Sequence, residues 1–119
     1  MTSQEKTDFS RYGKSFQEGL AALILQDRAF SDQIQEVLET DYFELKYLQV
    51  FVDRIFNYKE KYNVHPTAKI FTTILRTGLD DETDAVKKQT RDYFARIYNT
   101  EVKDSEFVKN TSLDFCRKQ

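Results

Sequence analysis

The longest helical pattern in the chain covers residues 41–67, and it limits the fold more than any other segment. Asp41 and Glu44 have the spacing of a capping box at the start of a helix. Pro66 ends that helix, because proline disfavours the α conformation of the preceding His65. Between these signals, apolar side chains recur every three or four residues, as on one face of an α-helix. They are Leu48, Phe51, Val52, Ile55, Phe56 and Tyr62. The sequence therefore predicts a long helix from about Phe43 to Tyr62 against which the other helices pack.

Five further segments show the same helical spacing. A first helix is predicted from Ser15, with Glu18 completing a capping box, and a second covers residues 30–40. A fourth follows Pro66 and ends at Gly78, which we expect in a left-handed conformation. A fifth begins after the acidic residues 80–84 and a sixth near Ser105, and no segment has the alternation or turn signals of strands. We expect one compact all-α domain of about six helices over residues 13–119, a terminal helical hairpin over residues 81–119, and a flexible arm over residues 1–12.

Composition narrows the function classes. The 119 residues carry a net charge of −2, which gives no indication of the basic face that a duplex-binding protein usually has, so DNA binding is not expected. The single cysteine, Cys116, excludes an internal disulfide and a cysteine-based metal cluster. No apolar run reaches the roughly 20 residues that a membrane span needs, and no signal peptide opens the chain. These features predict a soluble, cytoplasmic protein.

Residues with catalytic chemistry are few and scattered. The three glycines, Gly13, Gly19 and Gly78, lie too far apart to form a phosphate-binding loop. His65 is the only histidine, and Cys116 has no base near it in the sequence that could activate a thiol. Helix capping accounts for the acidic pairs. We therefore expect no catalytic residue, no metal site and no cofactor within this chain.

Several short motifs follow one another along the predicted helices. They are the apolar first helix Phe16–Asp27, Asp41-Tyr42-Phe43, Phe51 with Ile55 and Phe56, Pro66-Thr67, and the basic end at Arg117-Lys118. Their order resembles the N-terminal domain of DnaB-type replicative DNA helicases. The resemblance runs from about Tyr12 to Gln119 and depends on the order of these motifs rather than on any single one. The elements Tyr42-Phe43-Glu44 and Val108-Lys109 are most similar to the phage branch of the family.

The resemblance implies a non-catalytic collar domain of a ring-shaped hexamer. Such collars dimerise through a terminal helical hairpin and bind primase and the helicase loader. In the family, a linker helix and a RecA-like ATPase domain follow, so the whole protein would be an ATP-dependent DNA helicase. No helix stop signal follows Gln119, which favours a fragment cut at the linker.

The terminal segment, residues 81–119, carries more aromatic surface than two helices need to cover one core. Aromatic side chains in such positions are typical anchors of protein interfaces. The predicted interface residues are Tyr93, Ile97, Tyr98, Phe107 and Leu113. Each of them could instead belong to the core of the monomer.

Two other functions remain open at this stage. One is the helicase-binding domain of a bacterial-type primase, which has a similar helical fold. The other is a small single-stranded-DNA-binding protein, because Tyr58, Lys59, Lys61 and Tyr62 alternate aromatic rings with cations. A solvated helix end with lysines near the negative end of the helix dipole also accounts for that segment.

Overall fold

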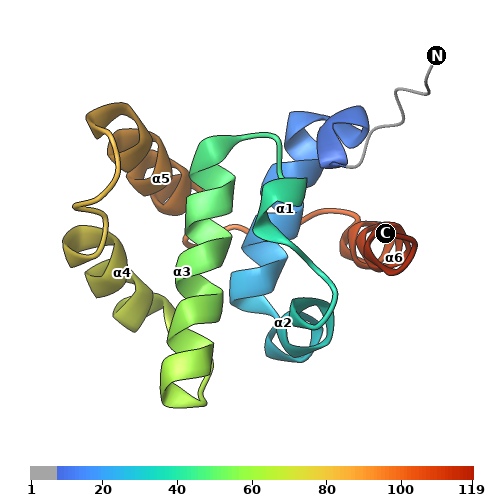
Figure 1. The fold of residues 1–119 in the computed structure, drawn as a ribbon, viewed down its shortest axis with the longest axis horizontal. Helices are drawn as coiled ribbons and strands as arrows, with labels where there is room; N and C mark the ends of the chain where they lie inside the picture. Colours follow the sequence, from blue (N-terminus) through green and yellow to red (C-terminus); the bar gives the residue numbers. More distant parts are fainter. Residues whose placement is uncertain (1–7) are drawn as a thin grey trace.

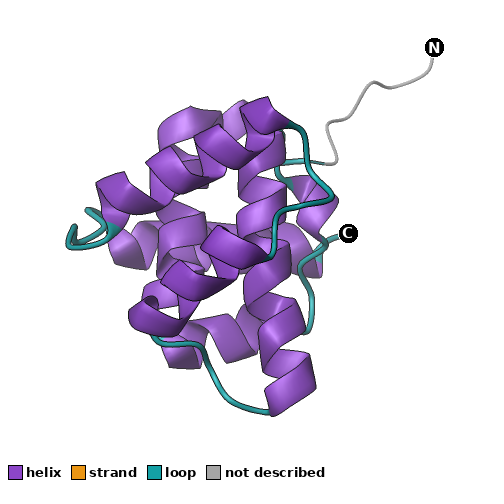
Figure 2. Cartoon of the chain, turned by 90° about the vertical axis from the view of Figure 1, so that its left-hand side faces the viewer, coloured by secondary structure: helices purple, strands orange, loops and turns teal. Residues whose placement is uncertain are grey.

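The computed structural model describes residues 8–119, and within that range the secondary structure consists of helices and their connections (Figures 1 and 2). The α-helices are α1 (Gly13–Gln26), α2 (Arg28–Gln35), α3 (Lys46–Tyr62), α4 (Ala68–Thr77), α5 (Asp84–Ile97) and α6 (Ser105–Arg117). Two short 3-10 helices, η1 (Phe9–Tyr12) and η2 (Thr40–Tyr42), precede α1 and α3. The predicted all-α class and the six helices are confirmed. None of the helices in residues 8–119 has the length and apolar character required to cross a membrane.

Helices α1 and α3 lie side by side at the centre of the fold (Figure 1). Helix α3 contacts α5, which in turn contacts α4, on one side of this pair. Helices α2 and α6 contact α1 on the other side. This arrangement explains why α1 and α3 are each buried around much of their circumference.

The core follows the helical periodicity of the sequence. Along α1 the buried residues are Phe16, Gln17, Leu20, Ala21, Ala22, Leu23, Ile24 and Leu25. Five of the six residues predicted to form the apolar face of α3 are buried. The exception is Tyr62, which is 54% exposed because it lies in the last turn, beyond the helices that cover the rest of α3.

The predicted start of α3 is wrong by three residues. The helix begins at Lys46, its N-cap Leu45 makes no side-chain cap, and Asp41 lies in η2 instead of capping α3. Tertiary contacts account for the difference. Phe43 is fully buried, and the amide of Glu44 donates to Oε1 of Gln17 at 2.8 Å instead of entering a capping box.

The predicted capping box of α1 does not form either. The helix begins at Gly13 without a side-chain cap, and the Glu18 carboxylate accepts from Tyr47 and Arg96. At the other end of the fold, Gly78 has φ −108°, so the predicted left-handed cap of α4 is wrong. The left-handed residue that ends a helix is Asn63, at the C-cap of α3.

The acidic segment before α5 serves two purposes. The side chain of Thr83 caps α5 by accepting from the amide of Val86. Asp81 and Glu82 bind Arg54 of α3, with N–O distances of 2.9 and 3.3 Å. The segment therefore ties the start of α5 to α3 in addition to placing negative charge near a helix N-terminus.

Part of the predicted N-terminal arm belongs to the core. Phe9 of η1 is fully buried, with its ring centroid 5.3 Å from that of Phe43 and 4.8 Å from that of Phe115. Asp8 caps η1 by accepting from the amide of Ser10. The prediction of a flexible arm is therefore wrong for residues 8–12, and its remainder, residues 1–7, lies outside the described residues.

The last two helices do not pack together as a hairpin. Helix α5 packs on α3 and α4, whereas α6 packs on α1 and α2, so the two lie on opposite sides of the central pair (Figure 1). A short ion pair, 2.7 Å between Nζ of Lys109 and Oδ2 of Asp27, holds α6 at the junction of α1 and α2. The hairpin predicted for residues 81–119 is therefore replaced by two helices that each cover a different part of the core.

Side chains from other segments of the chain satisfy carbonyl groups at or just beyond the ends of α1, α4 and α5. Such carbonyls have no partner within their own helix. His65 binds the carbonyl of Leu25, Arg91 donates to the carbonyls of Leu75 and Arg76, and Gln26 donates to those of Ile97 and Thr100. These hydrogen bonds fix the ends of the helices relative to one another.

Candidate protein-interaction surface

The structure divides the five predicted interface residues into two groups. Tyr93 is fully buried and Leu113 is 7% exposed, so both belong to the core of the monomer. The ring of Tyr93 lies edge-on to Phe51 at 4.9 Å, and its hydroxyl donates to the carbonyl of Glu18 at 2.5 Å. Their assignment to an interface is corrected, because a docked partner cannot reach either side chain.

The other three predicted residues reach the surface. Phe107 is 63% exposed and Tyr98 is 46% exposed, while Ile97 is half-buried. The ring of Phe107 lies edge-on to Phe16 at 6.4 Å, and that of Tyr98 lies edge-on to Phe94 at 5.4 Å. Each exposed ring is therefore braced against a buried one, which holds it in a defined position.

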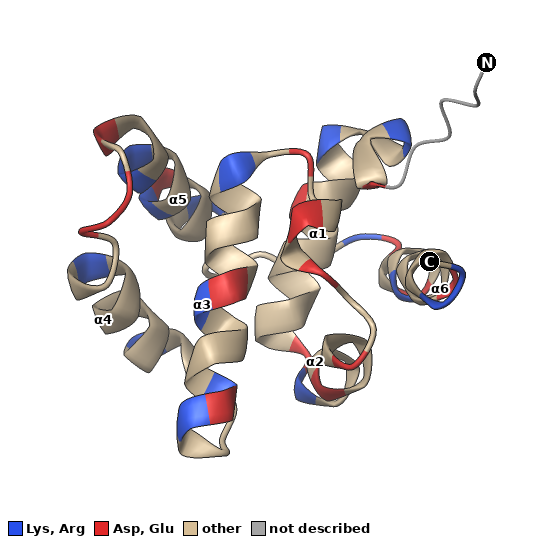
Figure 3. Ribbon diagram, viewed as in Figure 1, with Lys and Arg blue, Asp and Glu red and all other residues tan. Residues whose placement is uncertain are grey.

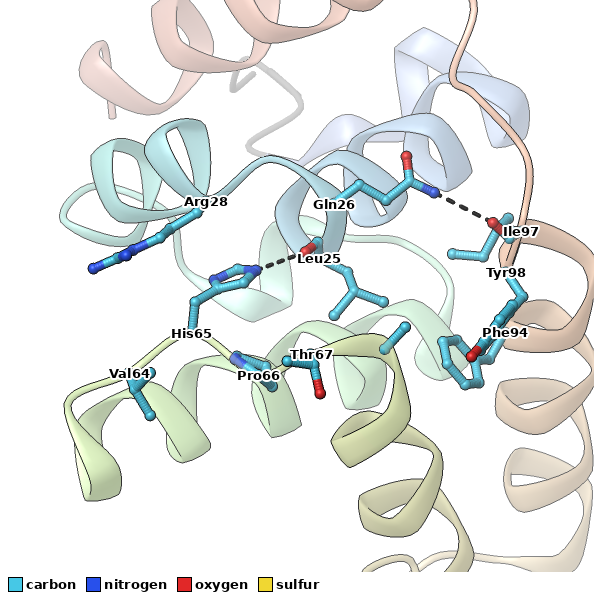
Figure 4. Close-up of a pocket in the computed structure, with 11 residues that line it drawn as sticks. Leu25, Gln26, Arg28, Val64, His65, Pro66, Thr67, Phe94, Ile97 and Tyr98 are labelled. Atoms are coloured by element: carbon cyan, nitrogen blue, oxygen red, sulfur yellow. Dashed lines mark hydrogen bonds between the residues drawn. The ribbon is translucent and has the colours of Figure 1, made fainter.

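Ile97 lines two pockets, one on each side of the connection between α5 and α6. The first has a volume of about 430 Å³ and lies between the end of α1, the connection from α3 to α4, and the end of α5 (Figure 4). The second, about 390 Å³, lies between α1, residues 100–104 and the start of α6, where Phe107 forms part of its wall. We call Ile97, Tyr98, Phe107 and these two pockets the connection surface.

His65 contributes an imidazole ring to the first pocket (Figure 4). Its Nε2 lies 2.6 Å from the carbonyl oxygen of Leu25, and since a carbonyl only accepts, Nε2 carries the proton. Nδ1 is then an acceptor, and it is buried without a hydrogen-bond partner in the described part of the chain. Burial lowers the pKa of His65, so the ring is neutral at pH 7. Its clear role is to anchor the connection from α3 to α4.

Metal-ligating groups and the thiol can be located within the described residues 8–119. No group of three or more His, Cys, Asp or Glu side chains is arranged to hold a metal ion in residues 8–119. Cys116 is buried, and burial raises the pKa of its thiol to about 12, so the sulfur stays protonated and unreactive.

The carboxylate of Glu18, which the sequence pattern predicts in a capping box, instead accepts hydrogen bonds from two other helices. Burial opposes its ionisation, but hydrogen bonds from Arg96 and Tyr47 lower its pKa overall. Burial and the bond to Glu18 raise the pKa of Tyr47. Glu18, Tyr47 and Arg96 therefore connect α1, α3 and α5, and their role is structural because they bond to one another.

The segment proposed for single-stranded DNA loses one of its cations in the structure. Lys59 is 8% exposed, and its Nζ lies 2.6 Å from Oδ1 of Asp32 and donates to the hydroxyl of Ser31 at 2.9 Å. The rings of Tyr58 and Tyr62 lie against each other, with centroids 4.7 Å apart. Lys59 therefore supports the packing of α2 on α3 and is not available to a phosphate.

Comparison of the chain with protein-family models, with characterised proteins and with solved structures found no match.

Proposed function

We propose that this chain is a non-catalytic protein-interaction domain of the kind found at the N-terminus of DnaB-type replicative DNA helicases. The proposal places it in the cytoplasm of a bacterium or of a phage-infected cell, where it contributes to DNA replication. Two features support it: the sequence order that resembles this family, and an all-helical domain that presents braced aromatic side chains to solvent.

The exposure of Phe107 is the observation that carries the proposal. Large aromatic side chains are enriched at the centres of protein interfaces, where they supply much of the binding energy. Phe107 is the most exposed of the large apolar side chains in the described residues, and it borders an apolar pocket next to Ile97. A partner side chain inserted there would bury Phe107 from the open side.

The chemistry of the other residues supports a binding role over a catalytic one. The one histidine is neutral and anchors a connection, and the one thiol is buried and protonated. ATP hydrolysis would belong to a separate RecA-like domain of the same polypeptide. By resemblance, the partners of this domain are a second copy of the chain, primase and the helicase loader.

Self-association is proposed through the connection surface rather than through a terminal hairpin. Helices α5 and α6 pack on opposite sides of the core, so they do not offer one continuous hairpin face. Tyr98 and Phe107 instead lie close to the two ends of the connection between these helices. A second copy could cover both without any change in the fold.

The test is the solution mass of the chain over a range of concentrations, measured by light scattering after size-exclusion chromatography. We expect a concentration-dependent dimer that Phe107→Asp abolishes. Tyr62→Asp is the matched control, because Tyr62 is similarly exposed but lines neither pocket of the connection surface. A strict monomer at high concentration, or equal effects of both substitutions, would remove self-association from the proposal. An in-frame coding sequence without a RecA-like domain would contradict the helicase assignment.

A further inference from the structure

A groove of about 810 Å³ lies between α4 and α5, on the side of the molecule away from α6. It is lined by Thr72, Leu75, Arg76, Arg91, Phe94, Ala95, Tyr98 and Asn99. The floor is apolar, since Leu75 and Phe94 are 2% and 7% exposed, and the exposed Ala95 of α5 extends this floor. Every charged side chain in the lining is an arginine. The groove thus combines an apolar floor with positive charge only.

Both arginines lack a carboxylate partner in residues 8–119. The ion pairs within these residues involve other cations. The neighbouring Lys88, for example, binds Asp92 at 2.8 Å. Arg76 and Arg91 are exposed. The blue bands on α4 and α5 in Figure 3 show cations along both helices, and the red bands show acidic positions in their connection and on α5. Asp81 and Glu82 of the connection bind Arg54 of α3, and Asp92 of α5 binds Lys88.

Two hydrogen bonds hold the guanidinium of Arg91 in a fixed orientation. Its Nε donates to the carbonyl of Leu75 at 3.0 Å and its Nη2 to the carbonyl of Arg76 at 3.2 Å. A guanidinium has five N–H donors in a rigid plane, so at least three of them remain free. Two carbonyls at the end of α4 therefore fix the plane of the group while one edge stays open. A carboxylate that binds this edge does not have to order a flexible side chain first.

We propose that the groove between α4 and α5 binds an acidic segment of a partner protein, with an apolar side chain on the floor and carboxylates on Arg76 and Arg91. Charge complementarity decides the occupant, because two unpaired arginines beside a buried apolar floor match a segment that carries both kinds of side chain. Tyr98 closes one end of the groove and also belongs to the connection surface, so the two surfaces adjoin. The inference deepens the proposed function by naming a class of partner for this domain.

The test uses a fluorescein-labelled peptide in which a Leu-Phe pair is flanked on both sides by glutamates, titrated with the chain and followed by fluorescence anisotropy. We expect saturable binding that weakens as salt is added. Arg76→Glu should weaken it about tenfold or more, since it replaces an attractive charge by a repulsive one. Ala95→Glu should do the same by placing a carboxylate on the floor. Arg117→Glu is the matched control, because Arg117 is an exposed arginine on α6, on the opposite side of the fold, and should change the affinity less than about twofold.

Several results would overturn the proposal. Equal losses with Arg76→Glu and Arg117→Glu would mean that binding follows net charge alone. Equal binding of a peptide with glutamines in place of the glutamates would remove the role of the arginines. Stronger, Arg76-dependent binding of a labelled oligo-dT strand would assign the groove to nucleic acid, and an Arg76-dependent dimer would assign it to a second copy. No binding at low salt would also end the proposal. None of these results depends on the Phe107→Asp test, so this inference and the helicase assignment can fail separately.

Discussion

Replacing Tyr93 with alanine should strongly lower the free energy of unfolding, whereas the same replacement of Phe107 should change it little. Both residues were predicted from the sequence to form an interface, but Tyr93 is fully buried and Phe107 is 63% exposed. The pair therefore separates a side chain that stabilises the monomer from one that is available to a partner.

The expected magnitudes follow from burial and hydrogen bonding. Truncating a fully buried aromatic side chain to alanine costs about 3–5 kcal/mol, and Tyr93→Ala also removes the hydrogen bond to the carbonyl of Glu18. Tyr93→Phe keeps the ring and loses only that bond, for about 1 kcal/mol. Phe107→Ala removes a ring that is mostly in water already, so we expect roughly 1 kcal/mol or less.

Urea denaturation followed by circular dichroism at the helical band measures all three variants. The urea midpoint should be highest for Phe107→Ala, lower for Tyr93→Phe and lowest for Tyr93→Ala, with the slope of the transition unchanged in each case. Because small domains have about 5–15 kcal/mol of stability in total, Tyr93→Ala should remove a large fraction of it. Equal destabilisation by Tyr93→Ala and Phe107→Ala would refute the reasoning, since it would mean that exposure does not distinguish the two positions.

Three further predictions concern pH and packing. Burial lowers the pKa of His65 in the folded state. Its contribution to the free energy of unfolding is therefore present above about pH 6.5 and is lost as the pH falls through the lower folded-state pKa. Urea midpoints measured over this pH range should depend less on pH in His65→Gln than in the wild-type chain. The hydrogen bonds from Lys109 and from the amide of Phe30 lower the pKa of Asp27, so its contribution is present above about pH 4 and is lost as the pH falls through the lower folded-state value. In thermal melts, the melting temperature of Asp27→Asn should fall less at acid pH than that of the wild-type chain. The same fall in both chains would contradict a contribution from Asp27. Gly19→Ala should raise the free energy of unfolding by about 0.5 kcal/mol in urea titrations, because alanine favours the helix more than glycine does. The added Cβ would lie 3.3 Å from Cγ1 of Val102, so this gain requires a small shift of the connection that holds Val102. A lower free energy of unfolding would show that the connection does not shift.

Helix existence was predictable because it depends on local periodicity. The stripe on α3 from Leu48 to Phe56 follows the 3.6-residue repeat, and every one of those apolar positions is buried. Helix boundaries were less predictable, since they depend on contacts between distant residues. Phe43 leaves the helical path to enter the core beside Phe9, and Gln17 of α1 takes the amide of Glu44 that a capping box would have used.

The candidate site was only partly predictable for a related reason. Apolar spacing identifies the side of a helix that is buried, but it does not say which neighbour covers it. A terminal hairpin requires α5 and α6 to cover each other, and two such helices would not need Tyr93 and Leu113 for their shared core. The sequence therefore predicts both residues at an interface. In the structure α1 and α3 supply the missing partners. The groove between α4 and α5 was not predicted, because Arg76 and Arg91 are separated in the sequence and carry no motif.

The packing of α6 on α1 has a consequence for how the chain folds during synthesis. Phe9 precedes Phe115 by most of the domain in the sequence, yet the two rings rest against each other with centroids 4.8 Å apart. The side of α1 that α6 covers stays open to water until the end of the domain has left the ribosome. Segments from opposite ends of the domain, η1 and α6, therefore close the core together, and a nascent chain that stops before α6 presents an uncovered apolar stripe of α1 to chaperones.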